Sequence, residues 1–529
     1  MGQETIVSSE ARQVTRAAAL ISIGNVSSRV LGLVREMVKS YFFGAGGAVS
    51  AFDVAAQVPT MLYDLLVGGM LSSALVPVFS DYVRPERRAE LWRLVSLLLS
   101  LLTLFLGALT VGIEWAAPAV ARVLSGGLAP DYLTQAAQMI RITTPALLFL
   151  NVAGLLSGVL YALQRFRRPA FLGAISNATL VIVVTLLGRS RLGVLSLAVG
   201  LLAGSLMQVL FQLGDLRDAH LRFISPLAGH PALRTIGALY LPIGLGLIVD
   251  QLAVALSFNL ASRTGPSGIA WMKYAATIIQ FPLGMVVTAI SIAILPTLSR
   301  YANDAEEARF RATLAQGLRL VLVLVMPAAT LMLILAKPVV ALLFQRGNFM
   351  VADTRAVALA LRFNLLGLVF AALDQPLIFA FYARKDTWTP ALVGVATTAI
   401  YAILALIPAL FGQLTLPLLI LANSIKLTCH ALLMLTLFVR KVGDLAPYGL
   451  KHTLLLALGA SLLMAPFVAA GNWVAQRLGY TGFEGALLQV GLASGLGMLI
   501  YVLLLRWMGL EELALFREML VQRLKKNKS

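Results

Sequence analysis

The sequence predicts an all-α polytopic membrane protein with about 14 transmembrane helices. Of its 529 residues, 59% are hydrophobic and only 12% are charged, and the mean hydropathy is +0.87. Soluble globular proteins have about 25% charged residues, and the deficit here extends along the whole chain. Crossing a bilayer takes about 20 apolar residues. Runs of that length recur throughout the sequence and are joined by short loops.

The apolar runs place the spans in chain order. We expect them at residues 18–43, 51–80, 92–117, 136–163, 170–188, 192–214, 235–261, 269–298, 315–336, 357–383, 389–411, 414–438, 452–473 and 486–508. One set of alternate loops is rich in basic residues, among them Arg165, Arg384 and Lys451. Because such loops stay in the cytoplasm, both termini are predicted to be cytoplasmic. An even number of spans agrees with that orientation.

An internal repeat divides the first 12 predicted spans into two halves. Residues 161–165 resemble residues 382–386, and Arg141 corresponds to Arg362 at the same offset of 221 residues. Each half holds six spans, so both copies enter the membrane from the same side. A pseudo-two-fold axis along the membrane normal is therefore expected to relate them, as in other parallel-repeat transporters.

The repeat predicts the domain organisation. We expect an N-terminal lobe at residues 1–220 and a C-terminal lobe at residues 221–443. Residues 444–529 would add two further helices and a basic cytoplasmic tail.

Composition excludes several classes of function. The formal net charge is +18, but the basic residues lie in loops between apolar runs, so membrane topology explains them better than nucleic-acid binding. The only cysteine, Cys429, excludes an intrachain disulfide, and none of the four histidines pair at metal-ligand spacing. No nucleophile and base are suitably arranged, and no phosphate-binding loop motif is present. We expect neither an enzyme, nor an ATP-driven pump, nor a resident cofactor.

Polar side chains share one face of the first predicted span. They recur at spacings of three and four: Ser22, Asn25, Arg29, Gly32, Glu36 and Lys39. An ionisable group at mid-membrane costs several kcal/mol at least, so it normally faces a watery cavity or a partner. Arg29 and Glu36 are also spaced to pair with each other. Arg35 and Lys39 lie near the end of the span and are also compatible with snorkelling to the surface, which for Arg35 is as good an explanation as a cavity.

Matching stripes occur on three other predicted helices. The second span carries Asp53, Gln57, Thr60 and Asp64, and its repeat partner carries Lys273, Thr277, Gln280 and Gly284. The seventh span carries Asp250 and Ser257, and prolines at 59, 77, 282 and 296 predict bends in the second and eighth spans. We therefore predict a transporter cavity lined by Asn25, Arg29, Arg35, Glu36, Asp53, Gln57, Thr60, Asp64, Asp250, Lys273, Thr277 and Gln280.

Helix packing alone competes with this interpretation. An isolated Thr60 or Gln280 is explained more simply as a contact between helices. The charged residues instead favour a cavity, because burying a charge within the membrane costs more free energy than burying an uncharged polar group. Lys426 and His430, four residues apart in the twelfth span, are compatible with a proton relay, although packing is the simpler explanation.

Four motifs resemble the MurJ/MviN family of lipid II flippases, in the MOP exporter superfamily. Residues 28–36 resemble the family's opening S-R-[VI]-L-G-x-x-R-[DE], and residues 280–284 followed by 295–299 resemble its eighth helix. Residues 342–349 resemble its L-L-F-[EQ]-R-G-x-F signature, and residues 381–390 its F-Y-A-x-x-D-T-x-T-P loop. The likeness covers nearly the full length, and the combination is specific.

The resemblance implies a flippase of the bacterial plasma membrane. Such a protein turns a lipid-linked peptidoglycan precursor, an undecaprenyl-pyrophosphate glycan, across the membrane by alternating access. Family arginines in the cavity bind the pyrophosphate, and the two extra helices form a groove for the polyprenyl tail. Arg29, Arg35 and Glu36 match the family motif, and Asp250 matches an acidic position in helix 7. The implied partners are the lipid-linked substrate, membrane lipids and cell-wall synthesis proteins, with the protein itself a monomer.

Several positions depart from the family pattern. Ser50 replaces an acidic residue, residues 59–64 lack two basic positions, residues 66–69 replace F-A-E-G, and Thr277 replaces an arginine. Lys273 lies one turn from Thr277. The mixed charges keep three alternatives open: a flippase for another lipid-linked oligosaccharide, a cation-coupled small-molecule exporter of the MATE type, and a scaffold that no longer transports. A coupling monovalent ion is compatible with each transporter, and its identity is left open.

Overall fold

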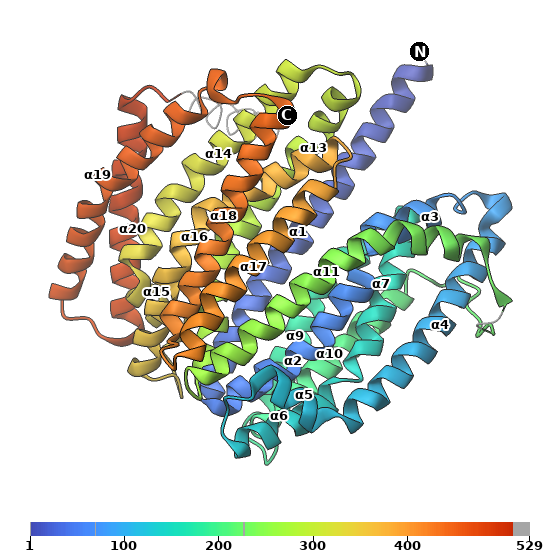
Figure 1. Cartoon of the computed structure of the whole chain (residues 1–529), viewed down its shortest axis with the longest axis horizontal. Helices are drawn as coiled ribbons and strands as arrows, with labels where there is room; N and C mark the ends of the chain where they lie inside the picture. The colour runs from blue at the N-terminus through green and yellow to red at the C-terminus, as the bar shows by residue number, and fades with distance from the viewer. Residues whose placement is uncertain (1, 69, 226–227, 511–529) are drawn as a thin grey trace. The chain divides into compact units, whose positions relative to one another are not determined.

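Helices make up all the regular structure of the chain in the residues that the computed structural model describes, which are 2–68, 70–225 and 228–510 (Figure 1). The all-α prediction is therefore confirmed. The basic tail predicted beyond residue 510 lies outside these residues. Contacts divide the chain into two compact units, residues 1–270 and 271–529, which are described separately below.

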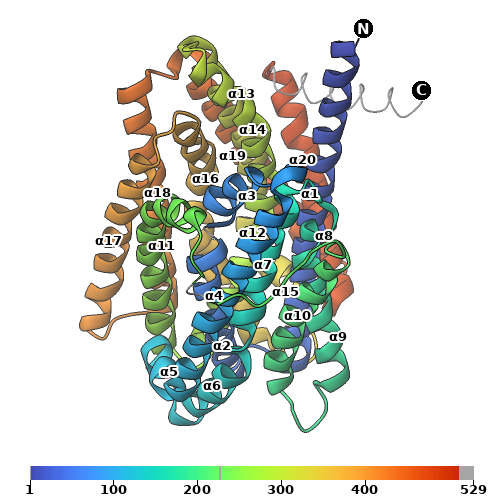
Figure 2. The ribbon, with the colours of Figure 1, turned by 90° about the vertical axis from the view of Figure 1, so that its right-hand side faces the viewer.

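The first unit holds the helices of the N-terminal half. In chain order they are α1 (Gly2–Phe43), α2 (Gly47–Tyr63), the π-helices η1 (Asp64–Gly68) and η2 (Leu71–Leu75), α3 (Val76–Ser80), the short 3-10 helix η3 (Pro85–Arg87), α4 (Arg88–Trp115), α5 (Ala117–Ser125), α6 (Pro130–Thr143), α7 (Ala146–Ala162), α8 (Arg167–Ala170), α9 (Leu172–Leu187), α10 (Leu195–Leu213) and α11 (Pro231–Arg263). Helices α9 and α10 pack side by side, and α9 also packs on α1 (Figure 2).

The second unit begins within α12 and holds the remaining helices. They are α12 (Gly268–Pro282), the π-helix η5 (Leu283–Val287), α13 (Thr288–Asn303), α14 (Glu307–Ile334), α15 (Ala336–Phe344), α16 (Val351–Ala383), α17 (Trp388–Leu410), α18 (Leu416–Val442), the 3-10 helix η6 (Ala446–Tyr448), α19 (Leu450–Arg477) and α20 (Gly482–Trp507). The last two helices run side by side, and α19 packs on α14 (Figure 1). The Tyr501 hydroxyl of α20 donates to the Val323 carbonyl of α14 at 2.9 Å.

The helices account for each of the predicted spans. Within the described residues, nine helices are long and apolar enough to cross a membrane, or 11 if each of two bent pairs is one span. The other predicted spans correspond to α1, to α2 with η1, η2 and α3, and to α9. The part of α1 within residues 18–43 contains four charged residues. The second span is interrupted by π-helices, and α9 has only 16 residues. The chain is thus a multi-span membrane protein.

The internal repeat predicted from sequence extends to backbone and side-chain geometry. Gln164 and Lys385, which are equivalent at the offset of 221, both adopt left-handed backbone conformations with φ of 58° and 61°. Non-glycine residues rarely do so. The Arg141 guanidinium donates to the Glu114 carbonyl at 3.3 Å, and that of Arg362 donates to the Leu333 carbonyl at the same distance. Each arginine thus binds the last turn of a preceding long helix, namely α4 or α14.

Breaks in the second and eighth spans occupy corresponding places. The sequence predicted bends at prolines, and π-helices lie close to two of them, because η5 directly follows Pro282 and η1 begins five residues after Pro59. A π-turn inserts one extra residue into a helix and often marks a functional site. Both repeats therefore carry an irregular helix at the position where the sequence places a polar stripe.

The compact units do not end where the predicted lobes do. Helix α11, expected to open the C-terminal lobe, packs in the first unit, where Ala232 and Ile236 join the hydrophobic core around Leu91 and Leu155. At its other end, the Asn259 amide donates to the Val123 carbonyl at 2.8 Å. The lobe boundary at residue 220 rests on the repeat rather than on compactness, and it stays a prediction.

Candidate functional site

A buried ion cluster joins α1 to α2 in the first unit. The Lys39 ammonium lies 2.6 Å from a Glu36 carboxylate oxygen and 2.9 Å from Asp53 Oδ1. The side chains of Lys39, Glu36 and Asp53 are 2%, 6% and 4% exposed. Buried charges are tolerated when they are paired and hydrogen-bonded. From the sequence, Lys39 was compatible with snorkelling to the membrane surface. That expectation is wrong, because the Lys39 side chain is buried between two carboxylates.

Arg35 completes the cluster and connects it to α9. Its guanidinium donates to Glu36 at 2.8 and 3.1 Å and to the Asn177 amide oxygen at 3.0 Å. The Asn177 amide nitrogen in turn donates to the Ser28 carbonyl of α1 at 3.1 Å. Two positive and two negative groups thus balance, so the cluster carries no net charge. Its geometry fixes α1 against both α2 and α9.

Local sequence explains why residues 14 positions apart meet. Helix α1 ends at Phe43, and α2 begins at Gly47. Gly44 between them has φ of 68°, a left-handed conformation that glycine adopts without steric cost. A side chain on Gly47 would meet the Tyr132 ring at 2.4 Å. The tight turn and this close packing bring the start of α2 back alongside the end of α1.

The remaining stripe residues of the first unit are more open. Asn25 and Thr60 are exposed, and Arg29, Gln57 and Asp64 are half-buried. The Thr60 hydroxyl donates to the Ala56 carbonyl of its own helix at 2.8 Å. The two helices therefore share a pattern, in which one end of each stripe is locked in the ion cluster and the other is accessible.

The other predicted site residues lie on α11 and α12. Asp250 is exposed on α11 of the first unit. In the second unit, Lys273 and Thr277 are half-buried one turn apart, Gln280 is exposed, and the Thr277 hydroxyl donates to the Lys273 carbonyl at 3.0 Å. The structure thus brings Arg35, Glu36 and Asp53 into one cluster and places the other predicted residues along accessible helix faces.

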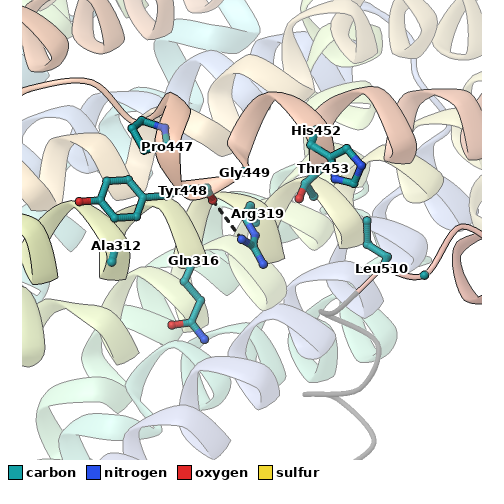
Figure 3. A pocket seen from close by; sticks show the side chains of 10 residues that line it. Ala312, Gln316, Arg319, Pro447, Tyr448, Gly449, His452, Thr453 and Leu510 are labelled. Carbon is teal, nitrogen blue, oxygen red and sulfur yellow. Dashed lines mark hydrogen bonds between the residues drawn. The ribbon is translucent and has the colours of Figure 1, made fainter.

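Two cavities lie elsewhere in the units. One, of about 610 Å³, is in the second unit between α14 and the start of α19, where Arg319 donates to the Tyr448 carbonyl at 3.0 Å beside His452 (Figure 3). The other, of about 510 Å³, lies between α5 and α6 in the first unit and includes Arg122 and Arg141. Neither is lined by a residue of the predicted site. The described residues contain no group of three or more histidine, cysteine, aspartate or glutamate side chains placed to hold a metal ion.

Comparison with known proteins identifies the family. Residues 39–489 match the family described as lipid II flippase MurJ. This chain belongs to the MurJ family. It is 30% identical over 483 residues to the lipid II flippase MurJ of Burkholderia cenocepacia, an alignment that covers 89% of this chain and 92% of the relative. It is 31% identical over 385 residues to the probable lipid II flippase MurJ of Haemophilus influenzae, covering 70% and 76%.

Solved structures share the fold. A lipid II flippase MurJ in an inward closed conformation superimposes with a TM-score of 0.77 at 22% identity, covering 95% of this chain and all of the other. An inward-facing multidrug resistance MATE transporter of the MOP superfamily superimposes with a TM-score of 0.68 at 15% identity, covering 80% and 99%. The family resemblance read from the four sequence motifs is confirmed.

Sequence reasoning missed three members of the polar interior of this MurJ-family chain. The polar stripe of α1 includes Lys39 but the predicted site does not, and the helical spacings do not point to Asn177 on α9. Asp374 on α16 was also not considered, although His430, whose ring nitrogen lies 2.8 Å from its carboxylate, was noted. Asn177 and Asp374 share one signal, since each forms a short polar pair with a neighbour, Ser176 or Gln375, within a mostly apolar run.

The family loop between α16 and α17 has a structural role in this chain. Asp386 accepts hydrogen bonds from the Thr389 backbone at 2.9 Å and from the Lys441 ammonium at 2.8 Å. Burial alone would raise the pKa of Asp386, but the bonds from Lys441 and Thr389 outweigh it and lower the pKa from 3.8 to about 2. Asp386 therefore fastens the start of α17 to the end of α18.

Replacing Asp386 with asparagine should lower stability by about 1 kcal/mol, since the partners are partly exposed. The lowered pKa makes the carboxylate stabilising above about pH 4, and that contribution is lost as the pH falls toward 2. The difference between wild type and Asp386→Asn should therefore stay constant from pH 5 to pH 8. Thermal unfolding in detergent at three pH values measures it, with exposed Asp304→Asn as the control. A difference that shrinks within this range would contradict the assignment.

Proposed function

We propose that this chain flips lipid II across the bacterial inner membrane by alternating access. The observation that carries the proposal is family membership over residues 39–489, together with relatives named lipid II flippase. The polar faces of α1 and α2 supply what such a substrate needs within an apolar bilayer. The proposal makes the chain a transporter rather than an enzyme, acting as a monomer on a lipid-linked substrate among membrane lipids, with cell-wall synthesis proteins as its cellular partners.

Arg29 is the residue we assign to the substrate's pyrophosphate in the first unit. It is half-buried on α1, one turn from exposed Asn25. Arginine suits a pyrophosphate because its planar fork donates two parallel hydrogen bonds to phosphate oxygens. Arg35 is committed to Glu36 and Asn177, so we assign it to positioning α1 rather than to the substrate. In the second unit, Lys273 supplies a positive charge beside Thr277.

The energy source is expected to be an ion gradient or the membrane potential. The sequence has no phosphate-binding loop motif for ATP. One charge that crosses 100 mV releases about 2.3 kcal/mol. With basic loops on the cytoplasmic side, both termini lie in the cytoplasm, and the head group travels away from them.

Complementation tests the function. A strain depleted of its own lipid II flippase should grow when it expresses this chain, and purified protein in liposomes should expose fluorescent lipid II on the opposite leaflet. Arg191→Ala, in an exposed loop, serves as the matched control for variants of the site. Good membrane expression without growth, and no flipping of lipid II in liposomes, would reject lipid II as the substrate. Flipping of another undecaprenyl-pyrophosphate oligosaccharide under those conditions would reassign the head group.

An exporter of small cationic compounds is the second candidate. The structural likeness to a MATE transporter favours it, as do Asp64 and Asp250, accessible carboxylates in the first unit. Overexpression should then raise resistance to several unrelated cationic drugs. Unchanged susceptibility together with growth of the depleted strain would leave the flippase as the function.

A further inference from the structure

A second polar pair lies within the second unit, apart from the predicted site. His430 Nδ1 of α18 is 2.8 Å from Asp374 Oδ1 of α16, and each side chain is only 13% exposed. Helices α16 and α18 pack closely. His430 is 14 residues from the start of α18 and 12 from its end, or about 21 and 18 Å along the axis. The ring therefore lies near the middle of a hydrocarbon core about 30 Å thick.

The geometry leaves one ring nitrogen available for a proton. With a hydrogen on Nδ1, the neutral ring donates to the Asp374 carboxylate, and Nε2 keeps its lone pair. Nε2 faces Gly394 of α17, where even an added methyl group would stay 4.0 Å away. The missing side chain leaves room beside Nε2. Proton uptake there changes the pair from a net charge of −1 to a neutral imidazolium–carboxylate pair.

Few other ionisable residues lie near this pair along the sequences of α16, α17 and α18. On α18 itself, Lys426 lies one turn earlier and Cys429 is adjacent. On α17 the only titratable side chain is Tyr401, about two turns beyond Gly394. On α16 the nearest other charge in the sequence is Arg362, which binds the Leu333 carbonyl. Protonation of His430 therefore changes the charge of the pair, and Lys426 is the nearest other cation along the sequence of α18.

The pair is connected to the broken eighth span through the next residue of α16. The Gln375 amide exchanges hydrogen bonds with the Thr288 hydroxyl, at 3.3 Å when it donates and 3.4 Å when it accepts. Thr288 begins α13, directly after η5, and its hydroxyl also bonds the Leu283 carbonyl of the π-turn at 3.2 Å. Pro376 follows and removes one backbone hydrogen bond from α16, which eases bending there. A change of charge at the Asp374–His430 pair therefore occurs next to the Gln375–Thr288 contact, which joins α16 to the π-turn η5.

We propose that Asp374 and His430 form the proton-binding site that couples transport to a proton gradient. The proposal rests on the transport function above and names its coupling ion. One proton adds to the Nε2 lone pair from water on one side of the membrane and leaves to water on the other. No bond of the substrate changes. The bound proton neutralises the pair, and Gln375 relays the rearrangement to η5.

His430→Gln tests the site because the amide can still donate to Asp374 but cannot take up a proton. In liposomes, an imposed pH gradient should accelerate wild-type flipping several-fold, and His430→Gln should lose this acceleration. Exposed His220→Gln is the matched control and should respond like wild type. Retained acceleration in His430→Gln, or wild-type flipping that ignores the gradient, overturns the proposal.

A second measurement does not depend on the substrate. Only the imidazole can take up a proton at this position, so purified wild type should bind one more proton than His430→Gln when an unbuffered sample is titrated with acid. If lipid II is not flipped at all, the function proposed above fails, and this titration still decides the site. No difference in bound protons would overturn it, and a difference of one proton would support it.

Discussion

Replacing Lys39 with methionine should destabilise the protein by about 3–5 kcal/mol, the cost of breaking a buried ion pair by removing one partner. Methionine fills a similar volume but leaves two carboxylates, Glu36 and Asp53, without their shared cation at 6% and 4% exposure. Thermal unfolding of the detergent-solubilised protein should show a clear fall in the midpoint. Exposed Lys451→Met should leave the midpoint unchanged.

A triple variant separates lost charge pairing from lost packing. Lys39→Met combined with Glu36→Gln and Asp53→Asn leaves no unpaired carboxylate, so most of the lost stability should return. If the triple variant is as unstable as Lys39→Met alone, the ammonium acts through packing. A Lys39→Met protein with wild-type stability would show that the cluster does not hold α1 to α2.

Arg29→Ala should slow lipid II flipping by roughly 10- to 150-fold, the value of a hydrogen bond to a charged group. Arg29→Lys should restore only part of the rate, because an ammonium keeps the charge but loses the bidentate fork. Glu36 is already paired with Arg35 and Lys39. Stability should therefore change little, in contrast to Lys39→Met. Flipping rates in liposomes and unfolding midpoints, measured on the same preparations, separate binding from folding.

Two results would contradict this assignment of Arg29. If Arg29→Ala unfolds early and Arg29→Ala with Glu36→Ala is more stable than either single variant, the arginine is a structural partner of Glu36. If Arg29→Ala is stable and flips lipid II normally, the accessible end of the α1 stripe does not contact the substrate. Arg191→Ala in the exposed loop controls for a general loss of positive charge.

The spans and the repeat were predictable because they depend on properties of one segment at a time. Hydropathy gives the helices, and an offset of 221 residues relates Arg141 to Arg362 and Gln164 to Lys385 before any contact is known. Proline marked the irregular helices, although the actual breaks are π-turns a few residues away or directly adjacent. Such turns depend on how neighbouring helices pack, and periodicity does not record that.

The partners of the buried charges were not predictable. Periodicity put Lys39 and Glu36 on one face of a helix, but the contact of Lys39 with Asp53 depends on the turn at Gly44 and on the packing of α2. The repeat gave no help with His430 and Asp374, whose equivalents in the first half are Val209 and Ala153. A pair that exists in one half alone leaves no trace in the internal symmetry.

The π-turns also determine how this family member can diverge. Each inserted residue rotates everything beyond it by about 100° relative to a continuous α-helix. Asp53, Gln57 and Thr60 precede the turns of the second span, and Lys273, Thr277 and Gln280 precede η5. Gain or loss of one residue in η1, η2 or η5 would therefore rotate the side chains that follow the turn to a new direction. The polar residues that precede the turn would keep their positions. The two ends of each span can in this way diverge independently of one another.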